Sequence, residues 1–233
     1  MIARPHISSL DLWERHELRV IAALTLALRK LMDGYDLPED EVNLNRRLSR
    51  CVLHAIRELD PDGSLFVSPP MWECNNQPDP DDETRAKRED KRPDCLWGYI
   101  DHLADVSRSA KHYVLECKRL GKPVRSDWVL NQNYINHGVL RFINESHGYG
   151  KSCASGTMIG YIQSMEPDDI LAEINTTCVT STLPQITVSA GGWVASGVSQ
   201  LEHTFARSFC ESPFALRHLW ADLRNSYSKR NAR

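Results

Sequence analysis

The chain has 233 residues, of which 41% are hydrophobic and 25% charged, and its formal net charge is −3. This length suffices for a sizeable core, and we predict a single domain over residues 1–233. The average composition excludes collagen, coiled-coil and wholly disordered chains, and the slight acidity excludes a polycation that coats nucleic acid. The longest dense apolar run, residues 20–28, is too short to span a bilayer.

Seven cysteines are spread along the chain without a CxxC pair. This distribution excludes zinc-finger spacing and favours a reduced, intracellular protein. The first fourteen positions include Arg4, Asp11 and Glu14, where a signal peptide needs an apolar stretch. We therefore expect a cytoplasmic protein.

Hydrophobic periodicity predicts two helices at the start of the chain. The first, residues 10–32, has apolar residues almost all round its axis, which indicates burial. The second, about residues 39–59, lies between two prolines and has its apolar residues on one face. Glu41 lies in the middle of that face, where a carboxylate is costly unless it is paired or binds a cation. Alternatively, Glu41 is a first-turn acid that favours the helix dipole and reaches solvent.

The rest of the chain alternates strands and helices. Apolar runs predict strands over residues 65–67, 95–100, 113–117 and 157–162. A mobile loop is expected over residues 73–92, where five acids precede five bases. The later part predicts helices over 126–145 and 168–174, a connector over 190–197, strands over 201–208 and 214–223, and a frayed basic tail over 224–233. This order indicates an α/β or α+β fold with a central mixed sheet flanked by helices.

The predicted third strand carries the most informative pattern. Side chains alternate between the two faces of a strand, so Glu116 and Lys118 share a face. Asp94 opens the preceding strand and can lie beside Glu116 if the two strands pair. Two carboxylates at a strand end form an oxygen site that suits Mg²⁺, and an adjacent lysine can position water or neutralise charge. This combination predicts metal-assisted hydrolysis of a phosphodiester.

Pro93-Asp94, a spacer and then Glu116-Cys117-Lys118 resemble the motif of the PD-(D/E)xK nuclease superfamily, which has the restriction-endonuclease-like fold. The resemblance covers about residues 39–162 and implies a core of a helix, three strands, a helix and a strand. The N-terminal helix, a C-terminal elaboration over about 163–223 with its strand pair, and the tail would be additions.

The resemblance also implies roles for the motif residues. Asp94 and Glu116 would bind Mg²⁺, or Mn²⁺ as a substitute, together with the Cys117 carbonyl, and Lys118 would orient the attacking water. Glu41 matches the acid that the first core helix contributes in many members. Glu39 or Glu58 would take this role if that helix began elsewhere.

Short motifs also occur by chance, and this chain contains further Pro-Asp and ExK strings. It has five Pro-Asp pairs and a second ExK, Glu89-Asp90-Lys91. That second ExK lies in a polar run without a strand pattern, so only the set of Asp94, Glu116 and Lys118 combines spacing with an apolar strand. The competing interpretation is a solvated Glu116–Lys118 pair on a half-exposed strand. Gly150-Lys151-Ser152 imitates the end of a P-loop but lacks the first glycine.

Basic residues flank the motif and are candidates for phosphate contacts. They are Lys111, Lys118, Arg119, Lys122 and Arg125, although such runs also occur in ordinary exposed turns. In the helix 126–145, one stripe comprises Asn131, Tyr134, Gly138, Arg141 and Glu145. Tyr134 and Arg141 could contact phosphate, with Gly138 allowing close approach, unless the stripe simply faces water. The candidate nucleic-acid-binding residues are therefore Arg119, Lys122, Tyr134 and Arg141.

The predicted function is a Mg²⁺-dependent endonuclease that hydrolyses DNA, with restriction and anti-phage defence among the roles that the resemblance implies. The alternative is a non-catalytic nucleic-acid-binding or assembly subunit on the same fold. Expected partners are DNA, a second copy of the chain as a homodimer, and a partner protein in a defence system, and we expect no membrane association. The histidines at 203 and 218 are expected to be core or surface residues rather than proton carriers.

Overall fold

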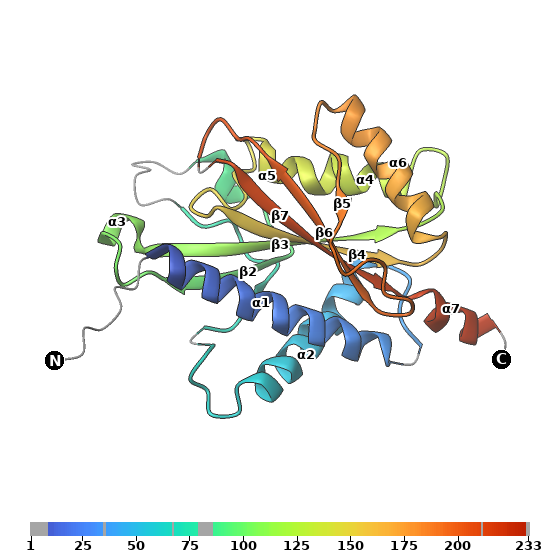
Figure 1. Ribbon diagram of the computed structural model, residues 1–233, viewed down its shortest axis with the longest axis horizontal. Coiled ribbons are helices and arrows are strands. Elements are labelled where there is room, and N and C mark those ends of the chain that lie inside the picture. Colours follow the sequence, from blue (N-terminus) through green and yellow to red (C-terminus); the bar gives the residue numbers. More distant parts are fainter. Residues whose placement is uncertain (1–8, 35, 67, 79–85, 211, 232–233) are drawn as a thin grey trace.

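The computed structural model describes residues 9–34, 36–66, 68–78, 86–210 and 212–231. Its centre is a seven-stranded mixed sheet with helices on both faces (Figure 1). The strands are β1 (Met71–Trp72), β2 (Cys95–Ile100), β3 (Ala110–Leu120), β4 (Ser155–Ile162), β5 (Thr187–Val188), β6 (Val198–Phe205) and β7 (Phe214–Asp222). The predicted mixed sheet flanked by helices is therefore confirmed.

The strand order is β1-β2-β3-β4-β7-β6-β5. The pairs β1–β2 and β2–β3 are antiparallel. The strands β3, β4 and β7 run parallel to one another. The pairs β7–β6 and β6–β5 are antiparallel and close the sheet. Since parallel neighbours need a crossover connection, the helical segment between β3 and β4 passes over one face of the sheet. This segment forms one wall of the candidate site described below.

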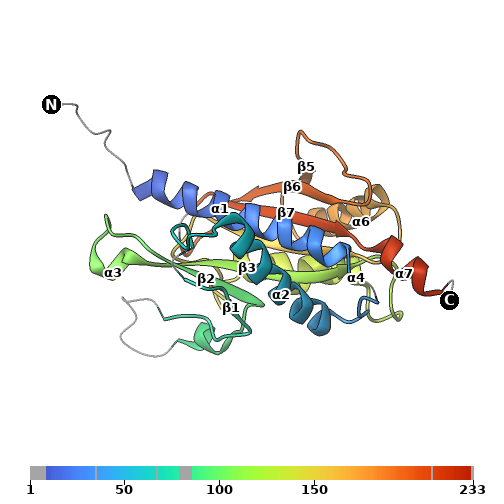
Figure 2. The ribbon, with the colours of Figure 1, turned by 90° about the horizontal axis from the view of Figure 1, so that it is seen from below.

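The helices form two layers. They are α1 (Ser9–Met32), α2 (Glu41–Leu59), η1 (Lys87–Asp90), α3 (Val106–Ser109), α4 (Leu130–Tyr134), the π-helical turn η2 (Ile135–Val139), α5 (Leu140–Ile143), α6 (Pro167–Thr180) and α7 (Arg224–Asn231). Helices α1 and α2 cover one face, and α4, α5 and α6 cover the other (Figures 1 and 2). The central strand β3 is buried on both faces, with Leu115 packed in the cluster beneath α1 and α2 and Val114 in the cluster beneath α4.

Several predicted elements agree with the structure. The helices over 10–32 and 39–59, the strands over 95–100 and 157–162 and the closing strand pair are confirmed to within a few residues. The third strand is longer than predicted, because β2 pairs with it from Ala110 and β4 pairs with it as far as Leu120, and α6 extends to Thr180. No helix in the described ranges is long and apolar enough to cross a bilayer.

Other predictions were wrong. Leu65 and Phe66 are not in a strand, and the edge strand β1 forms instead at Met71–Trp72, while residue 67 lies outside the described residues. In the expected loop 73–92, Lys87–Asp90 forms a helical turn, and residues 79–85 are among those not described.

The C-terminal tail was also predicted wrongly, because residues 224–231 form helix α7. The guanidinium of Arg224 donates to Asp222 Oδ1 at 2.9 Å, and the hydroxyl of Tyr227 donates to the Pro38 carbonyl at 2.7 Å. These contacts fix α7 against the end of the sheet and against the loop before α2. A frayed tail would lack such partners.

Candidate functional site

The pairing of β2 with β3 brings Asp94 beside Glu116. In this antiparallel ladder Cys95 lies opposite Leu115, so the preceding residue, Asp94, lies at the position of Glu116. The backbone N–H of Cys117 donates to Asp94 Oδ2 at 2.7 Å, which orients the Asp94 carboxylate towards the end of β3. The predicted adjacency of the two acids is confirmed.

Glu116 is fully buried, although it carries an ionisable carboxyl group. Its Oε2 accepts from Arg141 Nη1 at 2.9 Å, whereas Oε1 is buried without a hydrogen-bond partner among the described residues. Burial, together with the nearby Asp94 carboxylate, raises the pKa of Glu116 to about 8, although the cations Lys118 and Arg141 favour its charged form. An unpartnered oxygen on a buried acid is costly unless another group pairs with it.

Lys118 lies at the centre of an oxygen cage. Its Nζ is 2.8 Å from Glu41 Oε1, 3.4 Å from Glu116 Oε2 and 3.7 Å from Asp94 Oδ2. It also donates to the Cys117 carbonyl at 2.6 Å. Burial disfavours the ammonium, but Glu116, Asp94 and Glu41 outweigh burial and raise the pKa of Lys118, so it stays charged at neutral pH.

This geometry excludes the solvated Glu116–Lys118 pair. Glu116 is 0% exposed and Lys118 8% exposed, since β3 is a central strand covered on both faces. The pair is a buried charge cluster, not the surface ion pair that the competing interpretation required.

Glu41 is the acid that α2 contributes. Asp40 caps the helix by accepting from the backbone N–H of Asn43, so Glu41 is the first helical residue and reaches Lys118. Glu58 lies at the other end of α2 and pairs with Lys30 instead. Pairing with Lys118 explains why a carboxylate is tolerated on the apolar face of α2.

The residues fit a divalent cation in their chemistry. Carboxylate and carbonyl oxygens are the ligands that Mg²⁺ prefers, and Glu116 Oε1 lacks a partner among the described residues. Asp94 Oδ2 and Glu116 Oε2 contact the same Lys118 ammonium, at 3.7 Å and 3.4 Å. In the described part of the chain, however, no three His, Cys, Asp or Glu side chains are already arranged to hold a metal. The ammonium of Lys118 now occupies the centre of the cage.

The predicted nucleic-acid-binding residues lie in different surroundings: one is in the core, one contacts Glu116, and two line a cavity. Tyr134 was predicted wrongly: it is fully buried, its hydroxyl is 2.7 Å from His218 Nδ1 and accepts from Trp220 Nε1, and it cannot reach a substrate. Arg141 forms an ion pair with Glu116 at 2.9 Å and is partly exposed. Arg119 and Lys122 line a cavity of about 300 Å³ at the end of β3, and Arg119 also lines the pocket beside Lys118 that is described below.

The basic cluster around the motif is also divided. Lys111 lies near the start of β3, pairs with Asp101 at 3.1 Å and packs over the ring of Trp13 on the α1 face, so it is remote from Lys118. Gly138 does not leave room for phosphate: a Cβ there would meet Met158 and Lys118, so this glycine lets the helical segment pack against the sheet.

A pocket of about 380 Å³ adjoins the cage and was not predicted. Its lining includes Glu41, Lys118 and Arg141 together with Trp128, Asn133 and His137. The expected helix 126–145 begins only at Leu130, because residues 125–128 form a turn with its own bridge between Arg125 and Trp128. The four-residue spacing of Asn133, His137 and Arg141 was the available signal for a shared polar face.

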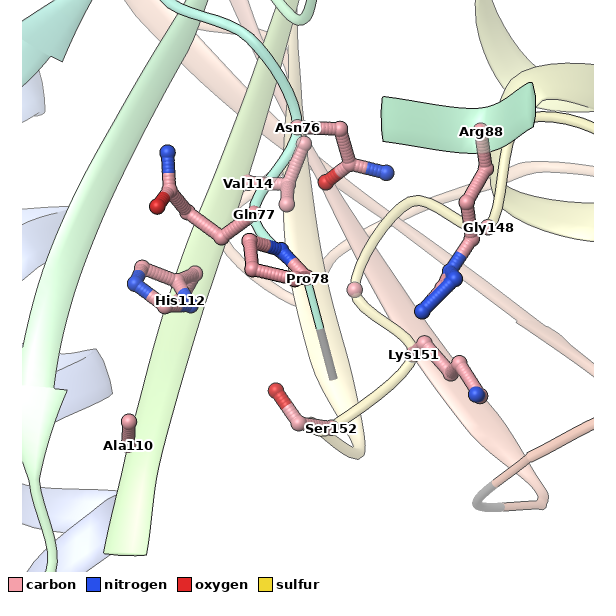
Figure 3. A pocket seen from close by; sticks show the side chains of 11 residues that line it. Asn76, Gln77, Pro78, Arg88, Ala110, His112, Val114, Gly148, Lys151 and Ser152 are labelled. Atoms are coloured by element: carbon pink, nitrogen blue, oxygen red, sulfur yellow. The ribbon is translucent and has the colours of Figure 1, made fainter. Parts of the chain in front are cut away.

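A second, polar cavity lies beside the same strand (Figure 3). His112 and Val114, which share the β3 face with Glu116, form one wall. Figure 3 shows Arg88 and Lys151 across from His112, and Ser152 next to Lys151 on the same loop. The Gly150-Lys151-Ser152 segment, which does not form a P-loop, thus contributes to this cavity.

No family model matches the chain, and the searches of curated proteins and of solved structures gave no match. The function must therefore be argued from the site.

Proposed function

We propose that this protein is a Mg²⁺-dependent endonuclease that hydrolyses phosphodiester bonds in DNA. The observation that carries the proposal is the meeting of Asp94, Glu116 and Lys118 at one buried point, with Glu41 completing the cage. Perturbed, clustered titratable groups beside a pocket are typical of functional sites. The same three residues form the motif that resembles PD-(D/E)xK nucleases.

The arrangement of elements supports a restriction-endonuclease-like core. That core is a helix, three strands, a helix and a strand. In this chain α2, β1, β2, β3, the α4–α5 segment and β4 follow one another in that order. The three acids and the lysine come from α2, from the start of β2 and from β3, at the place where these elements meet.

In the proposed mechanism each residue has a separate task. Mg²⁺, when bound, would supply positive charge for the phosphate and the leaving oxygen. Asp94, Glu116 and the Cys117 carbonyl would hold it, with Arg141 fixing the Glu116 side chain and the Cys117 N–H fixing Asp94. Lys118 would leave the Cys117 carbonyl to orient the attacking water, while Glu41 keeps the ammonium in place.

Cationic and polar groups on either side of the carboxylates support a DNA path. The pocket beside Lys118 is bounded by Arg119 and Arg141, and the cavity of Figure 3 by His112 and Lys151. His112 is four residues before Glu116 on β3, roughly 13 Å along the strand at about 3.3 Å per residue. A backbone crossing the site could thus meet positive charge on both sides of the carboxylates.

One observation favours the alternative, a non-catalytic nucleic-acid-binding subunit. Lys118 already neutralises the carboxylates, and such a cluster can serve packing alone. The alternative predicts DNA binding without any metal-dependent cleavage.

The test is cleavage of supercoiled plasmid with Mg²⁺ or with EDTA. The wild type should nick or linearise the plasmid only with Mg²⁺, and Asp94→Asn and Lys118→Ala should each lose this activity. Lys30→Ala, which removes a surface lysine paired with Glu58, is the control and should cleave like the wild type. Circular dichroism checks that the variants fold. Failure of folded wild type to cleave single-stranded, duplex and supercoiled DNA with Mg²⁺ or Mn²⁺ would favour the alternative.

A further inference from the structure

The pocket beside Lys118 has features that a phosphate contact does not explain. Its volume of about 380 Å³ lies within the roughly 300–1,000 Å³ range of small-molecule sites. Its lining combines the charges of Glu41, Lys118 and Arg141 with an aromatic wall, formed by an indole and an imidazole, and with an amide. Such a combination suits a ligand with a charged part and a planar, polar part.

The aromatic wall consists of Trp128 and His137. Their ring planes are 16° apart with centroids 6.5 Å apart, so the rings are stacked. Trp128 is 42% exposed, although large aromatic side chains are usually covered. His137 lies in the π-helical turn η2, a rare geometry that occurs frequently at functional sites.

The polar part of this wall is the Asn133 amide. Its Nδ2 is buried and has no hydrogen-bond partner among the described residues. A buried N–H₂ group without an acceptor costs free energy, which a ligand that supplies an acceptor would recover. Nucleobases carry ring nitrogens and carbonyl oxygens that accept hydrogen bonds in the plane of the ring.

We propose that this pocket binds the base of an unpaired nucleotide in DNA, stacked on Trp128 and hydrogen-bonded to Asn133, with the adjoining phosphate at Lys118 and Arg141. The inference rests on the proposed function, because it takes DNA as the ligand. It adds the substrate class: single-stranded DNA, or duplex DNA with an unpaired nucleotide. A base inside a duplex is stacked on its neighbours and paired, so it cannot enter a side pocket without leaving the helix.

The experiment measures binding in EDTA, so it does not require cleavage. Fluorescence anisotropy gives the Kd of the full-length protein for a labelled single strand, for the same strand annealed to its complement, and for single strands with one abasic nucleotide at successive positions. The wild type should prefer the single strand to the duplex. An abasic nucleotide at one position should weaken binding roughly 5- to 150-fold, the usual effect of losing one stacked base.

Variants assign the effect to the pocket. Trp128→Ala should weaken single-strand binding by the same roughly 5- to 150-fold and should abolish the abasic effect, and Trp128→Phe should restore most of the affinity. Asn133→Leu should weaken binding roughly 2- to 10-fold. Val124→Ala, which trims an exposed side chain in the same loop, is the control.

The two proposals fail in different ways. Equal affinity for strands with and without the abasic nucleotide, or unchanged affinity in Trp128→Ala, would overturn the base pocket even if the plasmid is cleaved. Conversely, a Trp128-dependent preference for single strands would support the pocket even if no cleavage occurs.

Discussion

Neutralising Glu116 should stabilise the protein, and the gain should grow as the pH rises. The isosteric variant Glu116→Gln keeps the shape and removes the titration. In the wild type, burial and the nearby Asp94 raise the pKa of Glu116 from 4.5 to about 8 in the folded state, whereas an unfolded chain has the ordinary value. Each pKa unit corresponds to about 1.4 kcal/mol, so the full difference corresponds to about 5 kcal/mol.

The sign follows from proton binding. Between pH 4.5 and about 8 the folded wild type holds a proton on Glu116 that the unfolded chain has released. Stability from this group is therefore fully present below pH 4.5 and is lost as the pH rises through 8. The wild type loses about 4 kcal/mol of this stability between about pH 5 and about pH 9. Glu116→Gln has no ionisable group at this position and keeps that stability.

The assay is urea unfolding of both proteins in EDTA at stepwise pH. The stability of Glu116→Gln minus that of the wild type should increase by about 4 kcal/mol from about pH 5 to about pH 9. Titrating groups outside the cluster of Asp94, Lys118 and Arg141 are common to both proteins and cancel. Glu58→Gln controls for loss of a surface carboxylate. Parallel stability curves for Glu116→Gln and the wild type would refute the reasoning.

Three further predictions concern stability. Lys118→Met should cost about 1–3 kcal/mol at neutral pH, because it leaves the partly covered Asp94 and Glu41 carboxylates without their shared cation. Lys30→Met in a surface pair should cost less than about 1 kcal/mol in the same urea titration. Gly121→Ala should cost roughly 1–3 kcal/mol in denaturant unfolding, because Gly121 has a φ of +136° and an added Cβ would lie 2.9 Å from the Ser164 carbonyl oxygen. In the control Gly191→Ala, the added Cβ has no atom within 4 Å, and stability should change by less than about 0.5 kcal/mol. Burial lowers the pKa of His203 to about 4, so between about pH 6.5 and pH 4 the unfolded chain binds a proton that the folded protein does not bind, and stability falls with pH. His203→Leu should remove up to about 3 kcal/mol of that fall. An unchanged loss of stability between pH 6.5 and pH 4 in this variant would contradict the assignment.

The part of the site that lies on the neighbouring strands β2 and β3 could be predicted from the sequence. The apolar alternation of β3 placed Glu116 and Lys118 on one face, and the hydrophobic start of β2 placed Asp94 next to them. The apolar face of α2 identified Glu41 as an acid that needs a partner. These relationships depend on local periodicity, which a single sequence contains.

The wall of the pocket could not be predicted in the same way. The stripe that included Tyr134 assumed a continuous α-helix from residue 126, but the turn at 125–128 and the π-helical turn η2 change which side chains face the site. Tyr134 consequently packs on Trp220 in the core, while His137 lines the pocket. Trp128 reaches the site because its loop folds back towards η2, which is a tertiary contact without a local pattern.

The central claim is that Asp94 and Glu116 form one divalent-cation site, and calorimetric titration of Mn²⁺ into the metal-free protein tests it most directly. The wild type should bind one ion per chain and release protons on binding, because the proton that Glu116 holds near neutral pH must leave. Asp94→Asn and Glu116→Gln should each lose this binding, while Glu58→Gln should retain it. Absence of binding in the folded wild type, with and without DNA, or equal binding in all four proteins, would contradict the claim.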